Sequence, residues 1–241
     1  NQFNSRAGFK PRCLLKFCKG DALPLWKPHL IVPASRGGVK SNLRMIAEKI
    51  VSALKSRTPE IIAGNGHKPA AVLIPIQVRH DDDYLVLTQR GDHLPTHKGQ
   101  IAFPGGRVDV GDKDIFHTAL RESEEEIGIN PEQVKILGRL DEFTAGYGLV
   151  VTPVVGVIPA YYEFRMDPRE TTAVASVPIH SLMERPNFTL DDKLSPGGHP
   201  SYHFYVNGWD VWGVTARILV QFLQLGYDFE VTSSVLANQQ R

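Results

Sequence analysis

The chain is poor in the features that would classify it at once. Its 241 residues include only 2 cysteines, Cys13 and Cys18, and no histidine pair lies near them to complete a zinc site. We expect reduced thiols, with a disulfide between them as the alternative. No apolar run approaches the roughly 20 residues that a membrane span requires. A fold held together by its hydrophobic core is therefore expected.

An excess of charge of one sign is lacking as well. Lysine and arginine number 27 against 26 acidic residues, for a net charge of +1, which favours neither nucleic acid nor an acidic surface as partner. Hydrophobic content of 42% and charged content of 22% are ordinary for a globular protein. No internal repeat is present, so the composition and length predict one generous domain, which we place at residues 41–230.

Acidic residues are absent from the first twenty positions. Five basic residues precede the first acid of the chain: Arg6, Lys10, Arg12, Lys16 and Lys19. Residues 1–40 therefore form either the remnant of a mitochondrial transit peptide or a plain basic arm on the domain. Residues 231–241 form a polar tail without a Ser-Lys-Leu ending, so no peroxisomal address is expected. A mitochondrial or a cytoplasmic location follows as the expectation.

The most informative stretch is residues 105–129, GGRVDVGDKDIFHTALRESEEEIGI. It predicts a helix that begins after Asp114 as N-cap and ends before Gly128. At roughly 100° per residue, one side of this helix is mostly apolar and should pack on a sheet. That side carries Phe116, Ala119, Leu120, Ser123 and Ile127.

Three glutamates share a narrow neighbouring face of the same helix. Glu122, Glu125 and Glu126 repel one another there, and a solvated helix has no need of such an arrangement. A hard divalent cation such as Mg²⁺ does need oxygen ligands gathered on one side. The alternative interpretation is an acidic face exposed to water.

The whole stretch resembles the signature of the Nudix hydrolases, which reads Gly, five residues, Glu, seven residues, Arg-Glu, then Glu-Glu and Gly. The matching positions are Gly106, Arg121, Glu122, Glu125, Glu126 and Gly128. Three departures are present. Asp112 stands where Glu is usual, one extra residue separates it from Arg121, and Ser123 replaces an aliphatic residue. The first two lie in the loop, which absorbs an insertion most easily.

This resemblance implies an α/β (α+β) fold, a Nudix-like α/β/α sandwich with a mixed β-sheet. It also implies hydrolysis of a nucleoside diphosphate linked to another group, with Mg²⁺ or Mn²⁺ as cofactor. Glu122 and Glu126 would be the primary metal ligands, completed by Glu125 and the carbonyl of Gly105. One of these glutamates, or Glu170 further along the chain, would act as general base. Glu170 is alternatively a further metal ligand or a loop acid in water.

The residues just upstream narrow the resemblance. The stretch V-L-T-Q-R at residues 86–90, then Gly99, then F-P-G-G at residues 103–106, is similar to the coenzyme A pyrophosphatase branch of the family. Two departures are Gly91-Asp92, where small residues such as Ser-Ala are common, and the lack of a basic residue near position 95. The branch implies cleavage of coenzyme A or acyl-CoA into 3′,5′-ADP and 4′-phosphopantetheine or its acyl form.

Two groups of residues receive roles from this resemblance. Substrate-binding candidates are Arg90, His97, Lys98, Gly99 and Phe103. Of these, Lys98, His97 and Arg90 are the cations available nearby for a 3′-phosphate. Arg90 contacts either a phosphate or a loop, or it forms an ordinary strand-end salt bridge. The structural positions are Gly106, Asp112, Arg121 and Gly128. We expect Arg121 to hold the loop and the helix together through Asp112 or Glu125.

Other functions stay open at this stage. The rival enzyme is a Nudix hydrolase that acts on ADP-ribose, a dinucleotide or a nucleoside triphosphate. The rival of another class is a catalytically silent domain that binds a nucleotide or a protein partner, which the intact glutamates argue against. The partner is then a small nucleoside diphosphate derivative, and a homodimer is compatible with the sequence.

Periodicity and turn residues predict the remaining elements. The predicted helices are residues 42–55, 180–184 and 215–225. The predicted strands are residues 70–78, 84–90, 101–103, 134–143, 149–158, 173–179, 202–206 and 209–212.

Several details of this prediction can be checked against a structure. Residues 81–83, three aspartates, are interpreted as a hairpin turn rather than a second metal site, and residues 191–200 as a loop. Pro153 suggests an edge strand or a bulge, because proline cannot donate to a ladder. His199 and His203 are interpreted as structural.

Overall fold

The computed structural model describes residues 49–62, 66–94, 97–191 and 198–231, all of them in one compact unit, Gly37–Arg241. The predicted arm at residues 1–40 and most of the predicted tail lie outside the described residues. The first part of the predicted helix at residues 42–55 does so too. Residues 49–56 are helical, which confirms the second part of that helix.

The described elements follow the predicted order closely. The strands are β1 (Lys68–Val78), β2 (Asp83–Arg90), β3 (Ile101–Ala102), β4 (Gly105–Arg107), β5 (Lys135–Arg139), β6 (Phe143–Ala145), β7 (Leu149–Ile158), β8 (Thr171–Pro178), β9 (Phe188–Asp191), β10 (Ser201–Val206) and β11 (Trp209–Val211). The helices are α2 (Ile115–Ile127), α3 (Ile179–Met183) and α4 (Gly213–Tyr227). Among the described residues, no helix combines the length and the apolarity that crossing a membrane would need.

The main sheet is mixed, as predicted. Its strand order is β3-β2-β1-β7-β5, with β4 beside β1, β6 beside β7 and β8 beside β2. The pair β1–β7 is parallel and the other pairs are antiparallel. One edge of β1 is shared, because β4 pairs with residues 70–72 and β2 with residues 76–78. The glycine pair of β4 is thereby placed at the middle of the sheet.

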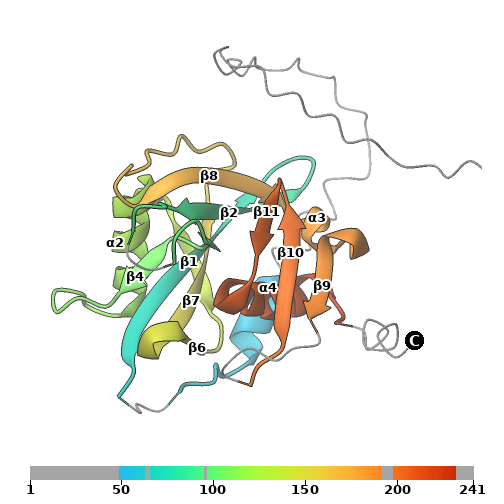
Figure 1. Ribbon diagram of the computed structural model, residues 1–241, viewed down its shortest axis with the longest axis horizontal. Helices are drawn as coiled ribbons and strands as arrows, with labels where there is room; N and C mark the ends of the chain where they lie inside the picture. Colours follow the sequence, from blue (N-terminus) through green and yellow to red (C-terminus); the bar gives the residue numbers. More distant parts are fainter. Residues whose placement is uncertain (1–48, 63–65, 95–96, 192–197, 232–241) are drawn as a thin grey trace, which may run out of the picture. The chain divides into compact units, whose positions relative to one another are not determined.

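Helices cover both faces of this sheet (Figure 1). Ala71 and Leu73 of β1 pack with α2 on one face, while Ala70 and Ile74 belong to the cluster that contains α4 and Ile50 on the other. Side chains of a strand alternate between its two faces, so β1 contributes to both layers. The arrangement is the α/β/α sandwich that the sequence predicted.

The predicted ends of α2 are confirmed. The side chain of Asp114 accepts a hydrogen bond from the backbone of His117, and Gly128 ends the helix with φ 72°, donating to the carbonyl of Glu124. Ser123 is fully buried and its hydroxyl donates to the carbonyl of Ala119 at 2.6 Å. The small residue therefore lies where the helix approaches the sheet, as expected.

The single strand predicted at residues 134–143 is wrong, because the chain forms β5 and β6 there. The side chains of Asp141 and Glu142 accept hydrogen bonds from the backbone of Glu60 and Ile62, which draws the intervening segment out of the ladder. The register of β5 against β7 also shifts beside Gly138, whose φ is 153°. These contacts join residues about eighty positions apart, which no local pattern reveals.

An edge position for Pro153 is also wrong. Pro153 lies in β7, which pairs with β1 on one side and with β5 and β6 on the other. It stands opposite the gap between β5 and β6, where the backbone of Leu140 donates to its carbonyl at 2.9 Å. Proline is tolerated there because the ladder is interrupted where its missing donor would be needed.

A second, three-stranded sheet has the order β11-β10-β9 (Figure 1). The predicted hairpin of β10 and β11 is confirmed, with Asn207 at φ 54° and Gly208 at φ 77° as its turn. The sequence prediction did not find β9. Phe188 of that strand packs on the rings of Tyr202 and Phe204, so contacts between strands stabilise it.

Candidate active site

Asp112 is the anchor of the loop before α2. Its side chain is 1% exposed and receives hydrogen bonds from Arg121 Nε and Nη2, both at 2.9 Å, and from Thr118 Oγ1 at 2.8 Å. The Arg121 hydrogen bonds hold the pKa of the Asp112 carboxyl well below its ordinary value. The extra residue between Asp112 and Arg121 leaves this two-point contact intact.

Arg121 joins this loop to the glutamates. Its Nη1 donates to Glu122 Oε1 at 2.9 Å and to Glu125 Oε2 at 3.1 Å, and its Nη2 also donates to the carbonyl of Arg107 at 3.1 Å. The guanidinium thus spans the loop, the helix and β4. It contacts one oxygen of each glutamate, so the second oxygen of each carboxylate points elsewhere.

Glu126 is a buried carboxylate with few hydrogen-bond or ion-pair partners. It is 4% exposed, accepts a hydrogen bond from the backbone of Gly105 at 3.2 Å, and lies 3.7 Å from Nη1 of Arg90. Burial, with the charges of Glu170 and Glu122, raises the pKa of Glu126 to about 8 against the opposing effects of Gly105 and Arg90. The protein alone therefore compensates the ionised form of this carboxylate poorly.

Glu122 lies against the same short strand. A Cβ atom at Gly106 would come within 2.4 Å of Glu122 Oε2, so any side chain there would displace the carboxylate. At Gly105, with φ 154°, a Cβ atom would lie 2.3 Å from the carbonyl oxygen of Ala71. The two glycines therefore let β4 fit between β1 and two carboxylates of α2. Burial also raises the pKa of Glu122.

Glu125 and Glu170 surround this centre from outside. Both side chains are exposed. Glu170 comes from the segment before β8, where its carbonyl accepts a hydrogen bond from the backbone of Gly91 at 2.9 Å. Its charge raises the pKa of both Glu122 and Glu126, so pairing of β2 with β8 brings Glu170 beside the glutamates of α2.

Arg90 ends β2 at the same place. The structure shows it beside Glu126, which corresponds to the strand-end salt bridge of the two interpretations, and its backbone pairs with Thr171 of β8. Its Nε is buried and has no hydrogen-bond partner among the described residues. Phe103, another substrate-binding candidate, is 3% exposed and lines the same cavity.

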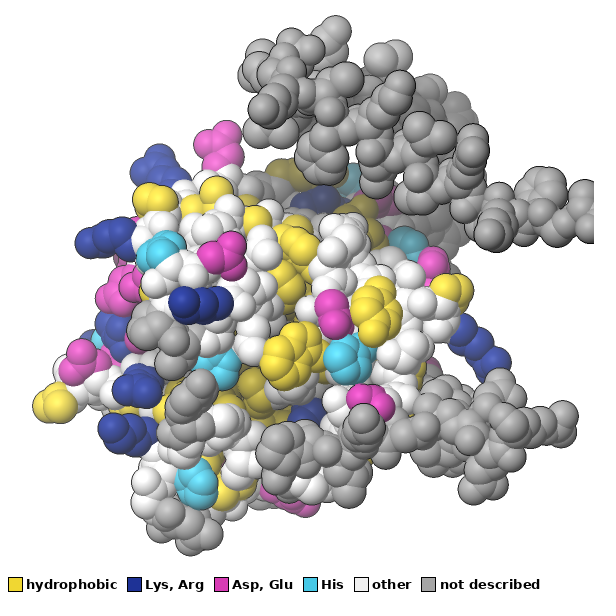
Figure 2. Space-filling view, viewed as in Figure 1, with side chains coloured by type: hydrophobic (Ala, Val, Ile, Leu, Met, Phe, Trp, Pro, Cys, Tyr) yellow, Lys and Arg dark blue, Asp and Glu magenta, His cyan; other side chains and the backbone are white. Residues whose placement is uncertain are grey.

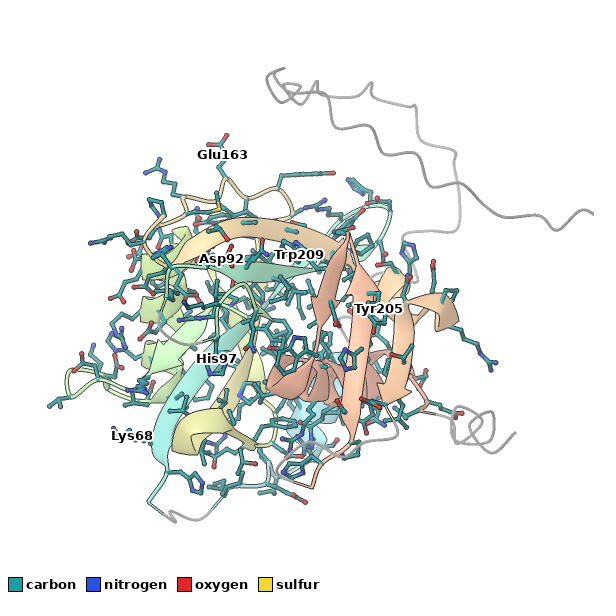
Figure 3. The ribbon with its side chains drawn as sticks, viewed as in Figure 1. Lys68, Asp92, His97, Glu163, Tyr205 and Trp209 are labelled. Carbon is teal, nitrogen blue, oxygen red and sulfur yellow. The ribbon has the colours of Figure 1, made fainter. Side chains whose placement is uncertain are left out.

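The loop between β2 and β3 holds the other candidates, with Asp92 and His97 labelled in Figure 3. His97 has φ 56°, and its Nδ1 lies 2.6 Å from Oε1 of Gln100. Both residues line the cavity at Glu126. Lys98 is exposed, and neither it nor Gly99 is part of the cavity lining.

A cavity of about 1080 Å³ extends from these residues across the sheet. Around it, Figure 2 shows charged side chains of both signs gathered at the side where α2 lies and apolar ones towards the small sheet. Its lining continues onto β6, the start of α4 and the segment before β10. The lining residues from that end include Thr144, His199, Trp212, Val214 and Arg217.

The sequence prediction missed this second end of the cavity. His199, interpreted as structural, lines it, with Nε2 3.3 Å from Oγ1 of Thr144. His203, by contrast, pairs with Asp210 at 2.9 Å. One signal was available for Arg217, because a basic residue stands between the buried Ala216 and Ile218 in an otherwise apolar helix.

The donor set suits a hard cation. Among the described residues, no three His, Cys, Asp or Glu side chains are already grouped as a metal site. Buried Glu126 and half-buried Glu122 nevertheless lie against one backbone segment, with two exposed carboxylates close by. Burial first, and neighbouring carboxylates after it, raise the pKa of both. Oxygen donors and excess negative charge are what Mg²⁺ or Mn²⁺ requires, so the residues fit such an ion.

Two solved structures have a similar course of the backbone. A MutT/nudix family protein from Enterococcus faecalis aligns with a TM-score of 0.48 and 16% identity, over 84% of this chain and 80% of that one. An Ap4A hydrolase from C. elegans aligns with a TM-score of 0.40 and 21% identity, over 46% of this chain and 80% of that one.

Sequence comparison gives the stronger similarity. The family model described as the NUDIX domain matches residues 67–196. An uncharacterized Nudix hydrolase, NudL, from Yersinia pestis (strain Pestoides F) is 38% identical over 159 residues, which span 66% of this chain and 79% of the relative. NudL from Yersinia pseudotuberculosis serotype O:1b matches to the same extent. The chain therefore belongs to the Nudix family and is a hydrolase that acts on pyrophosphate bonds.

Proposed function

We propose that the protein hydrolyses the diphosphate of coenzyme A or of an acyl-CoA, with Mg²⁺ or Mn²⁺. Water is added across the phosphoanhydride bond, which gives 3′,5′-ADP and 4′-phosphopantetheine or its acyl form. One observation carries the proposal. Residues of the upstream stretch, Arg90, Phe103 and Gly105, line the same cavity as Glu126, so the stretch similar to the coenzyme A branch lies in the site.

The size of the cavity supports a long substrate. Its volume of about 1080 Å³ lies just above the roughly 300–1,000 Å³ of ordinary ligand pockets, and its lining continues beyond the glutamates onto β6 and α4. A diphosphate alone would occupy only the end at Glu126. Apolar residues such as Val72, Leu149 and Val151 line the middle and suit an uncharged arm.

The metal site proposed here uses the residues that the family resemblance implies. Glu122 and Glu126 would hold the ion, together with Glu125 and the carbonyl of Gly105. The bound ion would supply charge neutralisation at the diphosphate and a lowered pKa of water.

The residues of the chain have separate tasks around that ion. Arg121 fixes one oxygen of Glu122 and of Glu125, and so orients both carboxylates. Arg90 brings a positive charge beside Glu126, where it can meet a phosphate oxygen. Glu170 is exposed near Glu122 and the buried Glu126, and it is our candidate for taking the proton of the attacking water.

The test is a comparison of substrates with the chain of 241 residues. kcat/KM is measured with Mg²⁺ and with Mn²⁺ for coenzyme A, acetyl-CoA, ADP-ribose and a dinucleoside polyphosphate, and the products are identified by mass. We expect coenzyme A or its thioester to be the best substrate, and turnover to stop with a chelator and return with added metal.

Other results would point to the rival functions. If ADP-ribose or the dinucleotide is hydrolysed fastest, the coenzyme A assignment is wrong while the family assignment stands. Binding of these ligands without any turnover would identify a silent domain instead.

A further inference from the structure

The two ends of the cavity are separated by the width of several strands. Arg107 of β4 is paired with Ala70 of β1, which is paired with Val151 of β7, which is paired with Phe143 of β6. Neighbouring strands lie about 4.8 Å apart, so these three steps place β6 roughly 14 Å from β4. A diphosphate, whose two phosphorus atoms share one oxygen, is much shorter than this distance.

Arg217 of α4 lies over the far end of that row. Its Nη1 donates to the carbonyl of Thr144 at 3.1 Å, and its guanidinium carbon is 5.2 Å from the centre of the Phe143 ring. The side chain is half-buried and lines the cavity. No carboxylate in the described part of the chain forms an ion pair with it.

The surroundings of Arg217 favour an anion. Burial lowers the pKa of the Arg217 guanidinium, and its charge helps to lower the pKa of His199, which lines the same end of the cavity. A partly desolvated cation gains most from a partner of opposite charge. Carbonyl and ring contacts on the protein side hold the guanidinium in place without neutralising it.

The other cationic side chains near the cavity lie at its opposite end or outside its lining. Arg90 and Arg107, the remaining arginines of the described lining, stand on β2 and β4 beside the glutamates. Lys98 is exposed and outside the lining. A second anionic group of the substrate, away from the scissile diphosphate, would therefore meet Arg217.

We propose that Arg217 is a specificity-determining residue that binds the 3′-phosphate of coenzyme A. This inference rests on the proposed function. The 3′-phosphate is the one anionic group of coenzyme A outside its diphosphate, because adenine and the pantetheine arm are uncharged. A site that selects coenzyme A over its 3′-dephospho form needs a cation, and Arg217 supplies it.

The experiment compares coenzyme A with dephospho-CoA. kcat/KM is measured for the wild type, Arg217→Gln and Arg217→Lys, with Arg185→Gln as a matched control on an exposed arginine outside the cavity lining. Loss of a charge-assisted contact should lower kcat/KM for coenzyme A by roughly 10–100-fold, mostly through KM, and leave dephospho-CoA within about twofold. Arg217→Lys should retain part of the preference, and Arg185→Gln all of it.

Several outcomes would overturn the role of Arg217. An equal loss on both substrates means that Arg217 only joins α4 to β6, and melting temperatures would show that directly. If kcat/KM is unchanged in Arg217→Gln, or if Lys98→Gln shows the same selective loss for coenzyme A, the 3′-phosphate binds elsewhere. A wild type without preference for coenzyme A would also contradict it, although hydrolysis of coenzyme A would stand.

A binding measurement separates this inference from the proposed function. Calorimetry compares 3′,5′-ADP with 5′-AMP, which lacks the 3′-phosphate, on the wild type and on Arg217→Gln. Tighter binding of 3′,5′-ADP that disappears in Arg217→Gln supports the subsite even if coenzyme A turns over poorly. Equal binding of both nucleotides by the wild type would contradict the subsite even if coenzyme A is hydrolysed.

Discussion

Asp112 in the loop before α2 and Glu126 in the last turn of α2 are both buried carboxylates, yet their surroundings are opposite. Asp112 receives two hydrogen bonds from Arg121 and one from Thr118, and its pKa lies well below the ordinary value. Glu126 receives one backbone hydrogen bond at 3.2 Å, and its pKa is raised to about 8. The first carboxylate is satisfied by the protein, and the second is not.

The difference separates scaffold from reactive site. A buried carboxylate with all its partners stabilises the loop it belongs to, whereas an undercompensated one is costly unless a proton or a cation joins it. Arg121 links the two, since it holds Asp112 and also Glu122 and Glu125. Asp112, through Arg121, therefore sets the positions of the glutamates. The carboxylate of Glu126, which has few partners in the protein, supplies affinity for a cation.

Asp83 shows that a raised pKa alone does not mark a site. It begins β2, is 1% exposed, and its Oδ1 has no partner in the described part of the chain, while Oδ2 accepts from Tyr227 at 3.1 Å. Burial raises its pKa to about 6. Asp83 does not line the cavity, so only convergence with other groups distinguishes Glu126.

The largest effect should come from removing the uncompensated charge. Glu126→Gln keeps the volume of the side chain, so we expect a folded protein with turnover lowered about 10²–10⁴-fold. The melting temperature without metal should stay about equal, because the raised pKa already keeps Glu126 largely protonated near neutral pH. Glu124→Gln, an exposed neighbour on the same helix, is the control. Turnover like that of the wild type in folded Glu126→Gln would refute the assignment of the site.

Removing the compensated carboxylate should instead cost stability. Asp112→Ala leaves the half-buried Arg121 without its main partner, and breaking a buried pair costs roughly 3–5 kcal/mol. Chemical denaturation of the wild type and the variant measures the difference. Turnover should fall as well, because Arg121 no longer fixes the glutamates. A loss below 1 kcal/mol would mean that Asp112 is not the anchor of the loop.

Asp83 should make the stability of the protein depend on pH. The folded state holds its proton more tightly than the unfolded chain, so the contribution of Asp83 to stability is fully present below about pH 3.9 and is lost as the pH rises through about 6. The shift of roughly two units corresponds to roughly 3 kcal/mol. Asp83→Asn, which still accepts from Tyr227, should remove this decrease.

The difference between wild type and Asp83→Asn at each pH isolates this residue. Asp112 has the opposite sign, because its lowered pKa makes its contribution present near neutral pH and lost only in acid. If the free energies of unfolding of the wild type and of Asp83→Asn differ by the same amount at every pH from 4 to 7, the burial argument for Asp83 fails.

The smallest effect concerns the fit of α2 against the sheet. Ser123 is fully buried, so Ser123→Leu should overpack the contact at a cost of roughly 1–3 kcal/mol, while Ser123→Ala should be tolerated. Thermal unfolding of both variants gives the comparison. Equal melting temperatures for Ser123→Leu and the wild type would show that this face of the helix is looser than the structure indicates.

The sequence by itself determined the local parts of this protein. Asp114 and Gly128 define the ends of α2, the spacing of the glutamates defines its acidic face, and Asn207 with Gly208 defines a hairpin. Each follows from interactions within a few residues: a cap, a helical period, a turn that requires positive φ. Such interactions are present whatever the rest of the chain does.

Only the tertiary structure decided how these parts meet. Pairing of β2 with β8 brings Glu170 beside Glu126, and contacts across about eighty residues divide one predicted strand into β5 and β6. Packing of α4 places Arg217 over β6, at the far end of the cavity that begins at Glu126. Burial and charge are sums over neighbours from distant segments, and that is why the pKa of each carboxylate follows from the fold rather than from its local sequence.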